Sequence, residues 1–208
     1  MKLNSNIKTA IRVAKIELNS MFYSPVAWLV LVIFGFQIGM SFAQIYGEQL
    51  RYQDMGYDLW SVTSGVYTGM RGILPPIQRY IYLYIPLITM GLMSREYQSG
   101  SIKLLYSSPV KNTSIIIGKF LSMMVYGGAL IAVLGVFVIF SAITIVNFDY
   151  PLVLSGMLGL YLLILAYSAI GLFMSSITKY QVVAAIGTLA VLAVLNFIGD
   201  VGQAQGLM

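Results

Sequence analysis

Residues 119–146 read KFLSMMVYGGALIAVLGVFVIFSAITIV, and after the opening Lys119 this run contains no charged side chain. A helix rises about 1.5 Å per residue, so a run of this length can cross a hydrocarbon core of about 30 Å with some tilt. Four other apolar stretches are long enough to cross, at about 26–43, 77–93, 152–174 and 182–198. The pattern predicts five membrane spans.

The composition supports an integral membrane protein. Hydrophobic residues make up 59% of the 208 positions, charged residues only 9%, and the mean hydropathy is +0.85. Lipid offers no water to bare backbone groups, and the sequence lacks the alternation of a membrane β-barrel, so the spans must be helices. We therefore expect an all-α fold, a polytopic transmembrane helix bundle in which residues 1–208 form a single transmembrane domain.

Basic residues predict the orientation, because cytoplasmic segments collect Lys and Arg. With a cytoplasmic N-terminus, the inside segments hold Lys2, Lys8, Arg12, Lys15, Arg95, Lys103, Lys111, Lys119 and Lys179. The outside segments then hold Arg51, Arg71 and Arg79. The net charge of +5 is thus explained by topology and not by nucleic acid. Residues 44–76 form the large outside segment, either short interfacial helices or a binding loop.

An amphipathic helix is expected at about residues 5–23, before the first span. Its apolar residues recur at helical spacing and define one face: Ile7, Ile11, Ala14, Leu18 and Met21. Such a helix is expected to lie in the cytoplasmic membrane interface. The alternative is a helix that packs on a partner protein.

Several functional classes lack their chemical groups. The chain has no Cys and no His, which removes thiolate chemistry and the commonest metal ligand. Gly118-Lys119 lacks the earlier glycine of a phosphate-binding loop and is followed by Phe120. No Asp, Glu or Lys is expected at membrane depth, where an ion-driven carrier keeps such groups. We expect no catalytic residue, no cofactor and no metal.

A polar stretch, SREYQSGSIKLLYSSPV at 94–110, separates the second and third spans on the predicted cytoplasmic side. Gly100 interrupts the helix that leaves the second span, Ser101 can cap a new one, and Pro109 ends it, giving a helix of about two turns. Ile102, Leu105 and Tyr106 share one face of it. That apolar face either binds a partner or folds back under the bundle.

The stretch PLITMGLMSREYQSGSIKLLYSSPVKNTSIIIGKFLSMM resembles the cytoplasmic loop of type-2 ABC-transporter permeases. That family carries, in order, an acidic residue, Gly-Thr or Gly-Ser, Leu-Leu, Ser-Pro or Thr-Pro, and Gly-Lys. The matching positions are Glu96, Gly100-Ser101, Leu104-Leu105, Ser108-Pro109 and Gly118-Lys119. The N-terminal AKIELNSMFYSPVAWLVL is also similar, and most like the gliding-motility type of permease subunit.

The resemblance implies the permease subunit of an ATP-binding cassette exporter in a bacterial inner membrane. It implies two partners, a cytoplasmic ATP-binding subunit and a second copy or homologous permease. Residues 101–108 would be the coupling helix that docks on the ATPase. The residues assigned to this coupling are Glu96, Gly100, Ser101, Ile102, Leu104, Leu105, Tyr106, Ser108 and Pro109. Glu96 is either tied by an ion pair or cap at the base of the loop, or a solvated charge.

Members of that family usually have six spans, whereas this sequence ends after the fifth. We expect the sixth either to follow Met208 or to be absent from a shortened variant. The alternative function, from a different class, is a membrane scaffold or anchor without a translocation path. A scaffold would show no nucleotide-dependent movement of the first and fifth spans.

The docking hypothesis predicts the effect of Leu105→Asp. A carboxylate on the apolar face should leave membrane insertion intact but uncouple the permease from its ATPase, because the charge would lose its hydration in the docked state. The measurement is ATP hydrolysis by the detergent-solubilised complex. Normal co-purification and normal hydrolysis with the variant would show that docking does not use this face.

Overall fold

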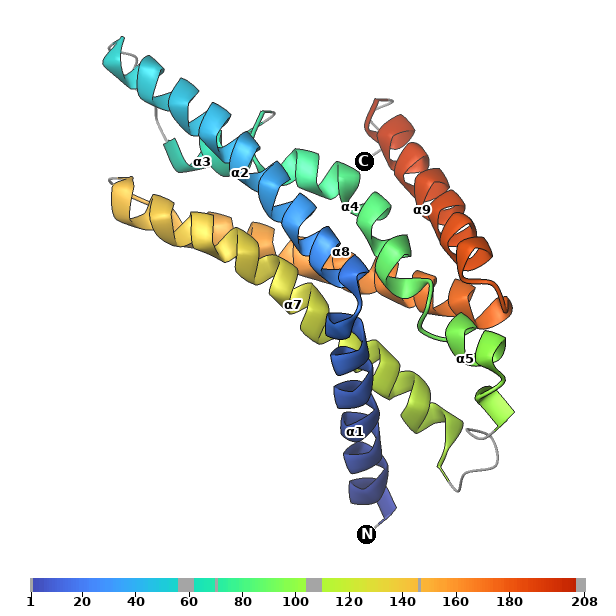
Figure 1. Ribbon diagram of the computed structural model, residues 1–208. Helices are drawn as coiled ribbons and strands as arrows, with labels where there is room; N and C mark the ends of the chain where they lie inside the picture. Colours follow the sequence, from blue (N-terminus) through green and yellow to red (C-terminus); the bar gives the residue numbers. More distant parts are fainter. Residues whose placement is uncertain (1, 56–61, 70, 104–109, 146, 205–208) are drawn as a thin grey trace.

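The computed structural model describes residues 2–55, 62–69, 71–103, 110–145 and 147–204, and over these ranges the chain is helical with no strand (Figure 1). The helices are α1 (Lys2–Tyr23), α2 (Pro25–Asp54), α3 (Val62–Tyr67), α4 (Leu74–Thr89), α5 (Ser94–Ser99), α7 (Asn112–Thr144), α8 (Tyr150–Ile177) and α9 (Gln181–Ala204). The predicted all-α fold is confirmed.

Four helices are long and apolar enough to cross a membrane: segments Pro25–Gln49, Asn112–Thr144, Tyr150–Ile177 and Gln181–Gly202. They correspond to the first, third, fourth and fifth predicted spans; each begins before its predicted start, and all but the third also end after the predicted end. The second predicted span, 77–93, differs. Its helix α4 has 16 residues and ends at Thr89, followed by a turn that leads into α5. A crossing at this position therefore stays a prediction.

Helix α4 packs within the bundle, in contact with α2, α8 and α9 (Figure 1). Pro75 and Pro76 stand at its start, as expected, because a proline in the first turn has no amide hydrogen to leave unpaired. The core around it is aliphatic and aromatic. Its fully buried members include Phe34 and Ile38 of α2, Ile81 and Ile85 of α4, Leu130 and Leu134 of α7, Leu160 and Ile164 of α8, and Leu192 of α9.

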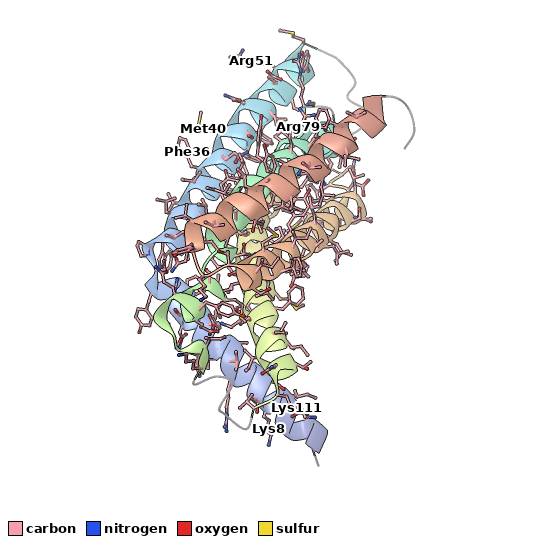
Figure 2. All side chains as sticks on the ribbon, turned by 90° about the vertical axis from the view of Figure 1, so that its right-hand side faces the viewer. Lys8, Phe36, Met40, Arg51, Arg79 and Lys111 are labelled. Atoms are coloured by element: carbon pink, nitrogen blue, oxygen red, sulfur yellow. The ribbon has the colours of Figure 1, made fainter. Side chains whose placement is uncertain are left out.

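The outer faces of these helices are apolar as well. On α2, the side chains of Phe36 and Met40 are 68% and 50% exposed and point away from the bundle (Figure 2). A helix that is hydrophobic all round needs an apolar environment on its outer side. This surface is suited to lipid, which agrees with the membrane fold.

Small residues line two helix contacts, but only one of them requires glycine. Gly35 and Gly39 of α2 face α7, where an added Cβ would lie 3.4 Å from Val133 Cγ1 and 3.5 Å from Phe137 Cζ, which is ordinary van der Waals contact. The contact between α1 and α7 is tighter. A Cβ on Gly118 would come within 2.7 Å of both the Ala10 carbonyl oxygen and Val13 Cβ.

Helix α1 buries one side against the bundle and leaves part of its predicted apolar face exposed. Ala10 and Met21 are buried, whereas Ile7 and Ile11 are 53% and 56% exposed. The buried side includes the close approach at Gly118, where the Ala10 carbonyl oxygen and Val13 meet α7. The exposed isoleucines keep α1 suited to a membrane interface, and that location remains a prediction.

The segment 44–76 contains helical structure at both of its ends. α2 continues to Asp54, and α3 packs against α2 and α8. The Tyr67 hydroxyl of α3 donates a hydrogen bond to Ser141 Oγ of α7 at 2.8 Å, and burial raises the pKa of this phenol. A short helix is thus anchored to the bundle here.

Basic side chains lie at both ends of the molecule. Figure 2 shows Lys8 and Lys111 at the end that holds the N-terminus, and Arg51 and Arg79 at the opposite end. Basic residues at the two ends fit a bundle that crosses the membrane, because both of its ends then lie outside the lipid. Which end faces the cytoplasm stays a prediction.

The contact at Gly118 predicts that Gly118→Ala will destabilise the protein by about 1–3 kcal/mol, the usual cost of overpacking. The obstructing atom is a backbone oxygen of α1, which cannot rotate away. The measurement is thermal unfolding in detergent.

Gly128→Ala is the matched control, since it lies on the same helix and an added Cβ meets nothing within 4 Å. Equal stability of the two variants would contradict the close packing of α1 on α7.

Candidate coupling site

The residues expected to couple to a partner begin on α5 and continue past it. The structure describes Glu96, Gly100, Ser101 and Ile102, while the predicted positions Leu104, Leu105, Tyr106, Ser108 and Pro109 lie outside the described residues. Gly100 ends α5 in the left-handed conformation with φ +72°, which favours glycine.

Ile102 packs against the bundle of its own chain. Its side chain is only 8% exposed and belongs to the main hydrophobic core. At Ile102 the chain therefore folds back onto its own bundle, and the part that this residue takes in coupling stays a prediction. The physical reason for the fold-back is the αL turn at Gly100, which redirects the chain immediately before Ile102.

The start of α5 is fixed by one serine of α8. Ser175 Oγ accepts hydrogen bonds from the amides of Met93 and Ser94, at 3.0 and 3.1 Å, and donates to the Met90 carbonyl oxygen at 2.9 Å. Ser175 is fully buried. These bonds satisfy polar groups at the junction of α4 and α5 that would otherwise be costly to bury. The base of the loop is thus attached to α8.

Lys119 of α7 is the most unusual side chain of this region. It is fully buried, and Nζ donates to three oxygens: Glu96 Oε1 of α5 at 2.7 Å, the Leu92 carbonyl at 2.6 Å, and Glu17 Oε1 of α1. An ammonium group has three hydrogens, and each has an acceptor here. One lysine therefore joins α1, α7 and the α4–α5 junction.

The charges of this cluster are unequal. Two carboxylates, with side chains 20% and 21% exposed, face a single ammonium group. Glu96 Oε2 is buried and has no hydrogen-bond partner among the described residues. Removing one member of a buried ion pair leaves an uncompensated charge, which is far more costly than replacing the whole pair by apolar groups. Lys119 is thus the member on which both acids depend.

Two weaker contacts add to the attachment of α5. Arg95 Nη1 donates to Ser20 Oγ of α1 at 3.1 Å, and Gln181 Nε2 of α9 donates to Gln98 Oε1 at 3.4 Å. Both are exposed, so each contributes little alone. Together with Lys119 and Ser175 they connect the short helix α5 to α1, α7, α8 and α9.

Sequence reasoning found Glu96 and Lys119 but not Glu17 or Ser175. Glu96 was expected to be either tied or solvated, and the structure places it in an ion pair. The sequence shows Glu17 only as an acid on the predicted cytoplasmic side, with no sign of its partner. The available signal was the lysine at the start of an apolar run, since a buried ammonium group requires a carboxylate nearby. No comparable signal pointed to Ser175, which lies 81 positions from Ser94.

The cluster offers no catalytic chemistry. It holds no nucleophile with an adjacent base, and no group of three His, Cys, Asp or Glu residues is placed to bind a metal in the described part of the chain. The arrangement can transmit a displacement of α5 to the helices that it contacts, α1, α7, α8 and α9.

Comparison with known proteins agrees with this geometry. The family described as ABC-2 family transporter protein matches residues 11–205. The chain belongs to the ABC-2 family. The match covers α1 from Ile11 onward, the four long apolar helices and the loop between α4 and α7, and so confirms the type-2 ABC-permease resemblance. No curated protein and no solved structure matches the chain.

Membership makes the chain a membrane component of a transporter. The structure explains the role of each residue in the Gly118-Lys119 pair at the start of the third span. Gly118 allows α1 to approach α7, and Lys119 then bridges the acid of α1 and the acid of α5.

The unequal charges predict that Lys119→Met will destabilise the protein by about 3–5 kcal/mol, because two acids would remain without a counter-charge. Unfolding in detergent would be followed by intrinsic fluorescence. Lys111→Met, an exposed lysine at the start of the same helix, is the control and should leave stability unchanged.

The triple variant Glu17→Gln, Glu96→Gln, Lys119→Met separates charge from packing. It should recover most of the lost stability, since no charge is left buried. A triple variant as unstable as Lys119→Met would mean that the loss comes from packing of the lysine chain and not from its charge.

Proposed function

We propose that this chain is the membrane-spanning permease subunit of an ATP-binding cassette exporter, coupled through residues 101–108 to a separate cytoplasmic ATPase. The family match supports a transporter membrane component. The basic bias of the segments around α1, α5 and α7 supports a cytoplasmic N-terminus in a bacterial inner membrane. A second copy or a homologous permease completes the translocation unit.

The observation that carries the proposal is the triple attachment of Lys119. Residues 101–108 follow directly after α5, so a partner that binds them pulls or pushes on α5. Glu96 passes this displacement to Lys119 on α7, and Lys119 passes it to Glu17 on α1. Ser175 passes it to α8. ATP binding on the partner then biases the packing of the whole bundle through contacts that differ between two states.

The presence of two carboxylates around one ammonium group suits a contact that shifts during coupling. When α5 shifts, Lys119 can keep Glu17 as its partner and is not left as an unpaired buried charge. The free energy of such a shift is therefore lower than that of breaking a one-to-one buried pair. Gly100, with its positive φ, separates the attached helix α5 from the segment that meets the ATPase.

Nucleotide-dependent movement of α2 against α9 tests the proposal. The chain has no cysteine, so Met40→Cys and Val194→Cys introduce unique sites for a spin-label pair. Both positions are at least half exposed, at 50% and 57%. In the complex with its ATPase, the label distances should change when ATP and vanadate are added. Unchanged distances during normal ATP hydrolysis would identify the chain as a scaffold.

The role of the Lys119 cluster is tested in the same complex with Glu96→Gln. This variant keeps a one-to-one pair of Lys119 with Glu17, so the fold should persist. The factor by which ATP binding on the partner changes the conformation of the permease should fall by about 5- to 150-fold. This range corresponds to the usual coupling free energy between two sites. Glu48→Gln on α2, an exposed acid at the opposite end, is the control. A full response with Glu96→Gln would remove Glu96 from the transmission path.

A further inference from the structure

A polar cavity lies between the start of α4, the middle of α8 and the end of α9. Its volume is about 450 Å³, within the usual range of small-molecule sites. Its polar lining consists of Gln78, Arg79, Tyr80, Tyr167, Asn196 and Asp200. Figure 1 places the start of α4 and the end of α9 at the same end of the molecule, far from α5 and the start of α7. The cavity is thus separate from the site described above.

Arg79 and Asp200 supply one charge of each sign. Arg79 Nη2 lies 3.6 Å from Asp200 Oδ1, and the two side chains are 65% and 58% exposed. This distance exceeds that of an N–H···O hydrogen bond, and an exposed pair of this kind contributes little to stability. The two groups can therefore separate and bind other charges at low cost.

The floor of the cavity is organised by α8 and α9. Asn196 Nδ2 donates to the Tyr167 hydroxyl at 3.0 Å and to the Leu192 carbonyl oxygen at 3.0 Å. Because the Tyr167 hydroxyl accepts from Asn196, its own hydrogen is available to an acceptor on a ligand. Tyr167 is only 9% exposed, so this donor is held in place by packing.

The remaining lining is apolar and adjoins the lipid-facing surface. Leu163 and Leu195 line the cavity, and Leu195 is 45% exposed on α9. Tyr80 is also 45% exposed, and tyrosine is enriched at the level of lipid head groups. A ligand of this cavity therefore combines a group with both charges and a hydrocarbon part.

We propose that this cavity binds the head group of a zwitterionic phospholipid with a primary amine, of the phosphoethanolamine class. The phosphate lies against Arg79, whose guanidinium group can donate two parallel hydrogen bonds to it. The ammonium group lies against Asp200, to which it donates. A choline head group has no N–H to donate, and a glycerol head group has no positive charge for Asp200. The inference does not depend on the direction of transport or on coupling to an ATPase.

The test uses the full chain, purified in detergent and depleted of lipid, with thermal unfolding as the readout. Dioleoylphosphatidylethanolamine should raise the unfolding temperature more than the phosphatidylcholine or phosphatidylglycerol of the same acyl chains, because a ligand of the native state stabilises it by mass action. Soluble O-phosphoethanolamine should have little effect, since it lacks the hydrocarbon part.

Two variants assign the charges. Arg79→Gln should weaken the apparent affinity for phosphatidylethanolamine by about tenfold or more, the loss expected for a hydrogen bond to a charged group. Asp200→Asn should remove the preference for phosphatidylethanolamine over phosphatidylglycerol. Arg51→Gln is the control, because Arg51 lies at the same end of the molecule but does not line the cavity (Figure 2).

Three results would overturn the proposal: equal stabilisation by phosphatidylethanolamine and phosphatidylglycerol, an equal loss in Arg51→Gln and Arg79→Gln, or full stabilisation by soluble O-phosphoethanolamine. If a variant is itself unstable, native mass spectrometry of the wild-type chain with an equimolar lipid mixture decides. Selective retention of phosphatidylethanolamine supports the site, and random retention refutes it.

Discussion

The burial of one positive charge constrains this structure more than any other interaction. Lys119 has no exposed surface, and its ammonium group is satisfied by oxygens from α1, α5 and the turn after α4. A cation in such a position is stable only if its acceptors are held in place. The close contact of α1 at Gly118, the turn at residues 90–93 and the anchoring of α5 by Ser175 all serve that condition. Four elements are thereby positioned by one side chain.

The same cluster explains how α5, at the start of the loop between α4 and α7, is held in place. Short helices are marginal on their own, and α5 has only six residues. Its stability must come from contacts with other elements. Several of those contacts are polar, in contrast to the aliphatic packing among α2, α4, α7, α8 and α9, while Tyr97 of α5 packs against the hydrophobic core. The bundle is thus connected to its loop by hydrogen bonds and charge as well as by apolar packing.

The sequence predicts well what the lipid requires and poorly what distant contacts decide. Four apolar runs became long helices because uncharged stretches have no alternative in a membrane. The predicted helix at 77–93 stops at Thr89, since Ser175, more than 80 positions away, satisfies the amides of the turn. The contact of α1 with α7 at Gly118 could not be predicted, because it joins residues far apart in the sequence. Glu96 and Lys119 were visible as motif residues, but Glu17 became a partner only through that packing.

The length of α7 has a mechanical meaning. With 33 residues it measures about 50 Å, well beyond a hydrocarbon core of about 30 Å. Part of this rod must therefore stand outside the lipid. The contacts of Lys119 hold α7 two turns from its beginning. A sideways displacement at that point therefore tilts α7 about the region where it packs in the bundle. Its far end, beside Tyr67 and α3, must then swing the opposite way, as the two arms of a lever do.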